Sequence, residues 1–237
     1  MGRLAAAAGG YPVLLGTEAD LAGRYQHPED AAAFLASRAL LRLLAARLLA
    51  VPAAEAATLE VTRYCRSCGG TDHGKPQVAG LEVSLSRTRT LVLAAAGPAG
   101  IRLGADVERL PEHVFDGFDE TVLSPAERRR AGRGRAGTVD RMRLWTAKEA
   151  ALKATGHGLA VEPVLLTVEP AGGADRLSAA RTACPAVPEL DGLHIGWIPA
   201  GEHHVAALAC NEPLPVQLRL PQLLFGSSAN AVETGQA

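Results

Sequence analysis

Alternating apolar and polar positions predict the strands of this chain. From 101 to 107 the odd positions are apolar, whereas Arg102, Asp106 and Glu108 are polar. A period of two is typical of a β-strand, and it puts the two carboxylates on one face of that strand. Segments of similar apolar character predict further strands at residues 11–15, 59–64, 81–86, 91–96, 164–168, 193–197 and 203–209. The third and fourth of these, separated by a short polar turn, predict a hairpin.

A long helix is predicted over residues 27–49. Proline is tolerated in the first turn of a helix, and Pro28 follows the first residue of this segment. Glu29 and Asp30 suit the positive end of the helix, and apolar residues then recur at helical spacing.

A second helix is predicted around residues 145–155. Trp145, Glu149 and Lys153 recur every four residues, so they share one stripe of this helix. Gly156 and Gly158 follow and predict its end.

These segments together indicate a particular chemistry. Magnesium prefers oxygen ligands and is usually held by one or two carboxylates plus substrate phosphates. Asp106, Glu108 and Glu149 offer carboxylates, and Lys148 and Lys153 offer compact positive charges for phosphate. The alternative is a solvated strand face and an ordinary helix ion pair worth about 0.2–0.5 kcal/mol. The joint occurrence of both segments favours the metal and phosphate interpretation.

Composition excludes several classes of function. The chain has 237 residues, a hydrophobic fraction of 48% and a formal net charge of −1. This near-neutral charge gives no overall reason to expect binding to nucleic acid or to an anionic membrane. No stretch reaches the roughly 18 uninterrupted apolar residues of a membrane helix. We therefore expect a cytoplasmic protein.

The two charged segments resemble the paired signature of a known family. Gly104-Ala-Asp-Val-Glu108 followed by Trp145-Thr-Ala-Lys-Glu-Ala-Ala-Leu-Lys153 is similar to the G-[IV]-D-[IVL]-E and W-[ST]-x-K-E-[AS]-x-x-K motifs of the 4′-phosphopantetheinyl transferases. Order and spacing match the longer, two-halved class, the surfactin-synthetase type. The resemblance implies a monomeric α+β fold of two similar halves related by a pseudo-twofold axis. The expected parts are an N-terminal half at 1–102, a C-terminal half with the metal site at 103–215, and a mobile tail at 216–237.

The resemblance also implies an activity. Such enzymes transfer 4′-phosphopantetheine from coenzyme A to a serine of an apo acyl or peptidyl carrier protein, which activates polyketide, non-ribosomal peptide or fatty acid synthases. It implies Mg²⁺ on Asp106, Glu108 and Glu149. Glu149 would accept the serine proton, directly or through a metal-bound water. Lys153 would stabilise the transferring phosphoryl group or protonate the leaving group.

Coenzyme A binding is implied by further motifs. Gly74-Lys75-Pro76 resembles the family's G-[KR]-P element, and Ser86-Arg87 occupies the position of its Ser-His pair. The first long helix of the family carries basic residues toward coenzyme A. The implied binding residues are Arg38, Arg42, Lys75, Pro76, Ser86, Arg87, Asp106, Lys148 and Lys153.

Two positions depart from the family pattern. Arg87 replaces the histidine, but a guanidinium binds phosphate through two hydrogen bonds and keeps its charge, so we expect binding to persist. Residues 31–33 are all alanine where relatives often have a basic residue. Arg24 could substitute for the missing charge.

The segment Cys65-Arg-Ser-Cys68, followed by His73, leaves three interpretations open. It could bind zinc, form a redox pair, or simply contain two loop thiols. A structural zinc site needs four ligands, and the remaining cysteines, Cys184 and Cys210, are far away in the sequence.

A basic run follows the predicted capping box of Ser124 and Glu127. It is either a solvated loop or a surface that attracts the acidic helix of a carrier protein.

Three other functions of the protein remain as alternatives. One is a different Mg²⁺-dependent nucleotide phosphoryl transferase, although the chain lacks a Walker-type phosphate loop. The others are a non-catalytic module that binds carrier proteins and a zinc-stabilised nucleic-acid binder.

Overall fold

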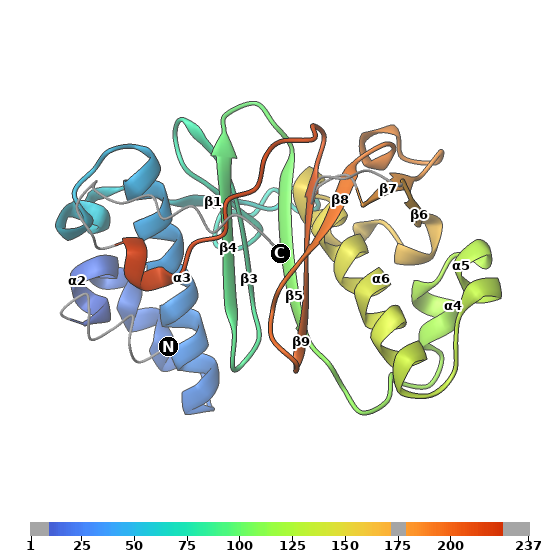
Figure 1. Ribbon diagram of the computed structural model, residues 1–237. Coiled ribbons are helices and arrows are strands. Elements are labelled where there is room, and N and C mark those ends of the chain that lie inside the picture. The colour runs from blue at the N-terminus through green and yellow to red at the C-terminus, as the bar shows by residue number, and fades with distance from the viewer. Residues whose placement is uncertain (1–9, 172–178, 225–237) are drawn as a thin grey trace.

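Two long helices flank a central group of antiparallel strands in the computed structural model, which describes residues 10–171 and 179–224 (Figure 1). The α-helices are α2 (Tyr11–Leu15), α3 (Pro28–Leu48), α4 (Phe118–Val122), α5 (Pro125–Arg130) and α6 (Gly134–Thr155). The strands are β1 (Thr62–Tyr64), β2 (Lys75–Gln77), β3 (Leu81–Arg87), β4 (Val92–Pro98), β5 (Leu103–Arg109), β6 (Thr167–Pro170), β7 (Ala180–Ala183), β8 (His194–Ile198) and β9 (His204–Cys210). Within the described part of the chain, no helix combines the length and the apolar character required to cross a membrane.

Helix α3 packs on the hairpin of β3 and β4. The hairpin pairs in register from Leu81 opposite Pro98 to Arg87 opposite Val92, which confirms the predicted hairpin. α3 confirms the predicted helix at 27–49 and has Pro28 in its first turn. The predicted strand at 11–15 is wrong, because these residues form the short helix α2, which buries two leucines against α3.

Helix α6 covers one face of a five-stranded antiparallel sheet in the order β5-β9-β8-β7-β6. A Cβ atom added to Gly104 would lie 1.8 Å from the carbonyl oxygen of Ala150, so the backbones of β5 and α6 are in direct contact. Gly156 ends α6 in the left-handed conformation, as predicted. The predicted strand at 164–168 begins only at Thr167, and β7 is a strand that the sequence did not indicate.

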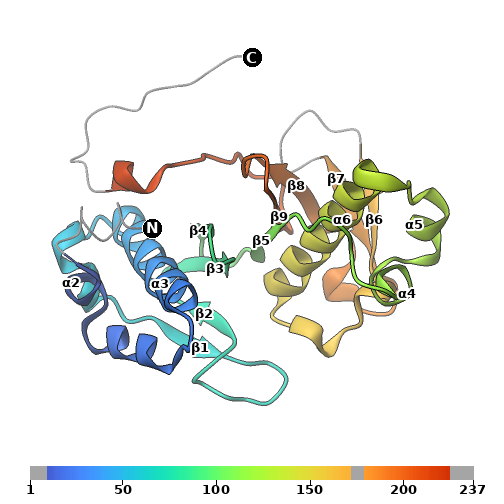
Figure 2. The same ribbon diagram turned by 90° about the horizontal axis from the view of Figure 1, so that it is seen from below.

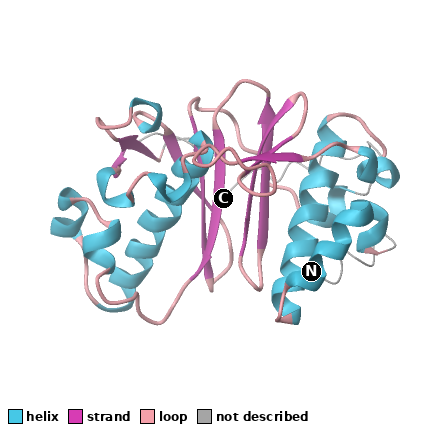
Figure 3. Ribbon diagram, turned by 180° about the vertical axis from the view of Figure 1, so that it is seen from behind, coloured by secondary structure: helices cyan, strands magenta, loops and turns pink. Residues whose placement is uncertain are grey.

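The β3–β4 hairpin and strand β5 lie side by side at the centre of the molecule (Figures 1 and 3). They belong to separate sheets, and side chains join them. Leu91, Leu93 and Ala95 pack against the cluster that contains Leu103 and Val107. Seen from below, α3 and α6 stand on opposite sides of these strands (Figure 2). The fold is therefore a mixed arrangement of helices and antiparallel sheet. Of the tail predicted at 216–237, residues 216–224 are described and include a short 3-10 helix, Pro221–Leu224, whose last residue is buried. Residues 225–237 lie outside the described residues.

Candidate functional site

Strand β5 directs two carboxylates toward helix α6. Asp106 contacts Lys153, and Glu108 accepts a hydrogen bond of 3.1 Å from the indole nitrogen of Trp145. Gly104, two residues before Asp106, touches the same helix. The even positions of β5 thus face α6, as the period of two predicts.

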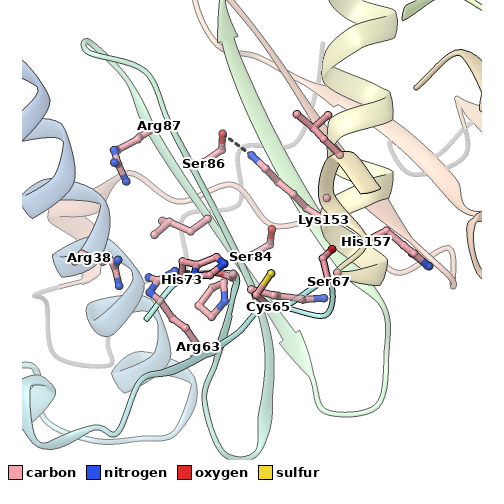
Figure 4. A pocket seen from close by; sticks show the side chains of 17 residues that line it. Arg38, Arg63, Cys65, Ser67, His73, Ser84, Ser86, Arg87, Lys153 and His157 are labelled. Carbon is pink, nitrogen blue, oxygen red and sulfur yellow. Dashed lines mark hydrogen bonds between the residues drawn. The ribbon is translucent and has the colours of Figure 1, made fainter. Parts of the chain in front are cut away.

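Lys153 connects three elements. Its Nζ atom lies 2.5 Å from Oδ1 of Asp106 and 3.0 Å from Oγ of Ser86, and the second contact is drawn in Figure 4. Ser86 in turn donates a hydrogen bond of 2.7 Å to Asp106. The C-terminal end of β3, the middle of β5 and the last turn of α6 therefore meet at one charged centre.

Glu149 lies one helical turn before Lys153 and belongs to the same centre. Burial raises the pKa of Glu149 to about 7; Lys153 opposes this shift, and the negative charges of Asp106 and Glu108 add to it. The pKa of Glu108 is also raised, first by burial and then by Asp106. Because each carboxylate affects its neighbours, the three form one electrostatic unit.

Two oxygens of this unit fit a bound cation. Oδ2 of Asp106 and Oε1 of Glu149 are buried and have no hydrogen-bond partner in the protein. A buried carboxylate oxygen without a partner is costly unless a cation compensates it, and oxygen donors of this kind suit Mg²⁺. Among the described residues, the three carboxylates are spaced more widely than the His and Cys cluster at residues 65–73, whose ligand atoms lie within 4.8 Å of one another.

A pocket of about 520 Å³ opens beside this centre (Figure 4). A volume between about 300 and 1,000 Å³ is typical of small-molecule sites. Ser86 and Lys153 belong both to the charged centre and to the pocket lining, so the two are adjacent. The other cationic side chains on the lining are those of Arg38, Arg63, Lys75 and Arg87.

Aromatic rings support two of these arginines. The guanidinium of Arg38 lies 4.9 Å from the ring centre of Phe34 and forms an ion pair of 2.8 Å with Glu18. Arg87 donates a hydrogen bond of 2.9 Å to the hydroxyl of Tyr25. Both guanidinium groups are thereby held at the side of the pocket nearest α3.

Arg63 on β1 is a site residue that the sequence did not indicate. Its Nη1 atom donates to the carbonyl of Gly74, whereas Nε and Nη2 are buried without a partner. Burial, together with the charge of Arg38, lowers the pKa of Arg63 to about 10. Buried guanidinium donors that lack an acceptor are suited to an anionic ligand. In the sequence, Arg63 is only a polar position in a short strand.

Comparison with known proteins finds similarity to one family in the segment that holds this centre. Residues 102–188 match the family model of the 4′-phosphopantetheinyl transferase superfamily. The matched domain contains β5 and α6, and hence all four charged residues of the centre. Over 161 residues the chain is also 31% identical to a Synechocystis sp. protein named as a candidate 4′-phosphopantetheinyl transferase. That alignment covers 63% of this chain and 60% of the relative, so the chain matches less than two thirds of the relative's length.

Lys148, within the matched segment, does not line the pocket. Its side chain has an exposed fraction of 0%, and its ammonium binds Glu127 at 2.6 Å and the carbonyls of Val122 and Pro163. Burial lowers the pKa of Lys148. The expectation that it holds the nucleotide end of coenzyme A is therefore wrong, and its role is to join α6 to α5.

Arg42 is also absent from the pocket lining. It forms an ion pair of 2.9 Å with Glu18 and donates to the carbonyl of Leu59. It does not line the pocket, so the structure corrects the expectation that it binds coenzyme A. Arg24 is exposed and does not line the pocket either, and thus does not supply the charge missing at residues 31–33.

The Gly74-Lys75-Pro76 element forms part of the pocket wall. Gly74 has a φ of +94°, and a Cβ there would lie 2.3 Å from the carbonyl oxygen of Tyr64, so only glycine fits. The Lys75 ammonium contacts the carboxylate of Glu82. It also donates hydrogen bonds to the carbonyls of Leu103 at 3.2 Å and Ala154 at 2.7 Å, so its charge is already paired within the protein. Its stem lines the pocket while its charge holds the end of α6.

Proposed function

We propose that this chain transfers 4′-phosphopantetheine from coenzyme A to a serine hydroxyl of an apo acyl or peptidyl carrier protein, with Mg²⁺ as cofactor. One observation carries the proposal: Asp106 and Glu108 meet Glu149 and Lys153 beside a pocket lined with cationic side chains. The superfamily match supports it, because the matched residues contain this centre.

In this proposal Asp106, Glu108 and Glu149 hold the metal. The partnerless buried oxygens of Asp106 and Glu149 favour this assignment. Bound Mg²⁺ would offset charge on the pyrophosphate and on the leaving phosphate.

The pocket residues would bind coenzyme A through its phosphates. Arg38, Arg63 and Arg87 can form paired hydrogen bonds to phosphate oxygens. Ser86 and Lys153 lie where the pocket meets the carboxylates, so we assign them to the pyrophosphate. Pro76 is buried in the pocket wall and would pack against the ligand.

The chemical step would use Glu149 and Lys153. The serine oxygen forms a bond to the phosphorus that bears pantetheine, and the bond from that phosphorus to the leaving phosphate oxygen breaks, which releases adenosine 3′,5′-bisphosphate. The serine proton would pass to Glu149, which lies beside Lys153 in the same centre and would act as the general base. The charge of Lys153 stabilises the negative oxygens that develop during transfer.

The carrier protein would dock on a basic surface near α5. Arg128, Arg129 and Arg130 form the last turn of α5 and are exposed, as is Arg133. An acidic carrier helix would be attracted to these charges. We further propose that the enzyme acts as a monomer.

Mass spectrometry of an apo carrier protein tests the proposal. We expect the carrier to gain one phosphopantetheine unit after incubation with this protein, coenzyme A and Mg²⁺, and to gain nothing with a folded Glu149→Gln variant. A non-catalytic carrier-binding module would bind the carrier without changing its mass. Unchanged mass across carriers of the fatty acid, polyketide and peptide classes would contradict the proposed activity.

A further inference from the structure

The loop between β1 and β2 brings together three side chains of types that can bind a metal. Cys65, Cys68 and His73 each offer one ligand atom, and these atoms lie within 4.8 Å of one another. The distance from Sγ of Cys68 to Nε2 of His73 is 3.3 Å. In a tetrahedral zinc site, bonds of about 2.3 Å to sulfur and about 2.0–2.1 Å to nitrogen put these two atoms about 3.6 Å apart. The cluster thus has nearly the spacing of a zinc site.

The loop backbone holds the two cysteines in place. The amide of Cys65 donates to the carbonyl of Gly70 at 2.9 Å, and the amide of Gly69 donates back to Cys65 at 2.8 Å. The amide of Gly70 points at the sulfur of Cys68 at 3.4 Å. A Cβ on Gly70 would lie 2.8 Å from Cε1 of His73 and 3.2 Å from the sulfur of Cys68, so a side chain there would displace the His73 ring from this position.

His73 is oriented by a neighbouring carboxylate. Oδ1 of Asp72 lies 2.6 Å from Nδ1 of His73. This hydrogen bond places the ring proton on Nδ1 and leaves the lone pair of Nε2 directed at the thiols. A carboxylate behind a histidine ligand is the usual arrangement around zinc, where it fixes the ring and increases its basicity.

We propose that Cys65, Cys68 and His73 bind one Zn²⁺ ion, with a water molecule as the fourth ligand. Two thiolates and an imidazole form a soft donor set that selects zinc over magnesium. Cys184 and Cys210 are fully buried elsewhere and do not join the site. The requirement for four ligands is met by water, because a zinc site with three protein ligands keeps one open position.

The ion would sit in the wall of the main pocket. Cys65 and His73 belong to the pocket lining and are drawn on its lower side in Figure 4. Arg66, between the two cysteines, binds Glu189 at 3.0 Å and so connects the loop to the C-terminal part of the chain. Zinc would therefore fix a loop that closes the pocket between α3 and α6.

Metal titration of the whole reduced protein tests this site. After removal of metal, Zn²⁺ is titrated against a chromophoric chelator in excess Mg²⁺, and Co²⁺ serves as a spectroscopic substitute. We expect one Zn²⁺ per chain and, with Co²⁺, thiolate charge-transfer and tetrahedral ligand-field bands. Cys65→Ser, Cys68→Ser and His73→Gln should each weaken binding by more than about 100-fold, and Asp72→Asn by about 10–100-fold.

Two further variants serve as controls. Ser67→Ala lies in the same exposed loop and should bind zinc unchanged. Glu149→Gln should also keep the stoichiometry, which separates this site from the carboxylate centre. Zinc should protect Cys65 and Cys68 from alkylation, as counted by mass spectrometry. The proposal is overturned if the reduced protein binds no zinc at micromolar concentration, if binding survives Cys68→Ser, or if the two thiols form only a disulfide and never hold metal.

Discussion

The ammonium of Lys153 lies 2.5 Å from the carboxylate of Asp106, and this contact joins the last turn of α6 to strand β5. The Asp106 side chain is 3% exposed and that of Lys153 is 30% exposed. A carboxylate so deeply buried needs a nearby positive charge, since removal of one partner leaves an uncompensated ion. The contact therefore belongs both to the proposed chemistry and to the packing of the two elements, and variants at the site should change both.

Substitution of Lys153 should separate these two roles. Lys153→Met removes the charge that we assign to the transferring phosphoryl group, so kcat/KM for carrier modification should fall by about 100-fold or more. The free energy of unfolding should fall by about 1–3 kcal/mol, less than for a fully buried pair because Lys153 is partly exposed. Kinetics by mass spectrometry and urea unfolding measure the two effects. Lys153→Arg keeps the charge and should recover most of the stability; an unchanged kcat/KM in Lys153→Met would remove this residue from the mechanism.

The buried carboxyl of Glu149 should make stability depend on pH. Its pKa is raised from 4.5 to about 7 in the folded protein, so between these values the folded state binds more protons than the unfolded state. The free energy of unfolding therefore falls as pH rises through this window. Glu149→Gln abolishes the effect. In EDTA, the variant should be more stable than the parent near pH 8 by on the order of 1–3 kcal/mol, and this advantage should shrink toward pH 5.

Urea unfolding at several pH values measures that difference. Added Mg²⁺ should stabilise the parent protein and not the variant, because a ligand that binds only the folded state shifts the equilibrium toward it. A stability difference that is the same at every pH would contradict the pKa assigned to Glu149.

Close packing at Gly104 should be essential to the site. A Cβ there would lie 1.8 Å from the carbonyl oxygen of Ala150 and 2.5 Å from the amide of Ala154. Gly104→Ala must therefore push α6 away from β5, which separates Glu149 from Asp106. We expect the free energy of unfolding to fall by about 1–3 kcal/mol or more, the usual cost of overpacking a core, and the proposed transferase activity to be largely lost. Gly23→Ala has open space around its Cβ and should change neither quantity.

The sequence predicted the acidic centre well, because its residues repeat at simple spacings. A period of two fixed the common face of Asp106 and Glu108, and a period of four grouped Glu149 with Lys153. Lys148 was assigned wrongly for a geometric reason. It precedes Glu149 by one residue, which turns it by about 100° around the helix and directs it at Glu127 in the core. Spacing alone did not show that this neighbouring face is buried.

The cationic end of the pocket was less predictable, since it depends on contacts between distant segments. Arg63 enters the site because β1 pairs with β2, which sets Arg63 opposite Pro76 across the cysteine loop. Nothing in the residues around Arg63 specifies that pairing. Similarly, Arg42 forms its ion pair with Glu18, which lies in the 3-10 helix Gly16–Arg24, and does not line the pocket.

Arg63 should contribute strongly to coenzyme A binding. Its Nε and Nη2 donors are buried and have no protein partner, and the residue lines the pocket together with Arg38 and Arg87. A hydrogen bond to a charged group contributes about 1.5–3 kcal/mol, so Arg63→Met should weaken coenzyme A binding by about 10–100-fold. Isothermal titration calorimetry measures the affinity. Dephospho-coenzyme A, which lacks the 3′-phosphate, should show a smaller loss if Arg63 binds that phosphate.

Arg24→Met provides the matched control for Arg63→Met. Both changes remove one arginine, but Arg24 is exposed and lies outside the pocket lining. If the pocket acts through specific contacts, only Arg63→Met will weaken binding, and the difference will persist at high salt because a buried ion pair is screened little. Equal losses in the two variants, both removed by salt, would mean that general electrostatic attraction and not the placement of Arg63 holds the ligand.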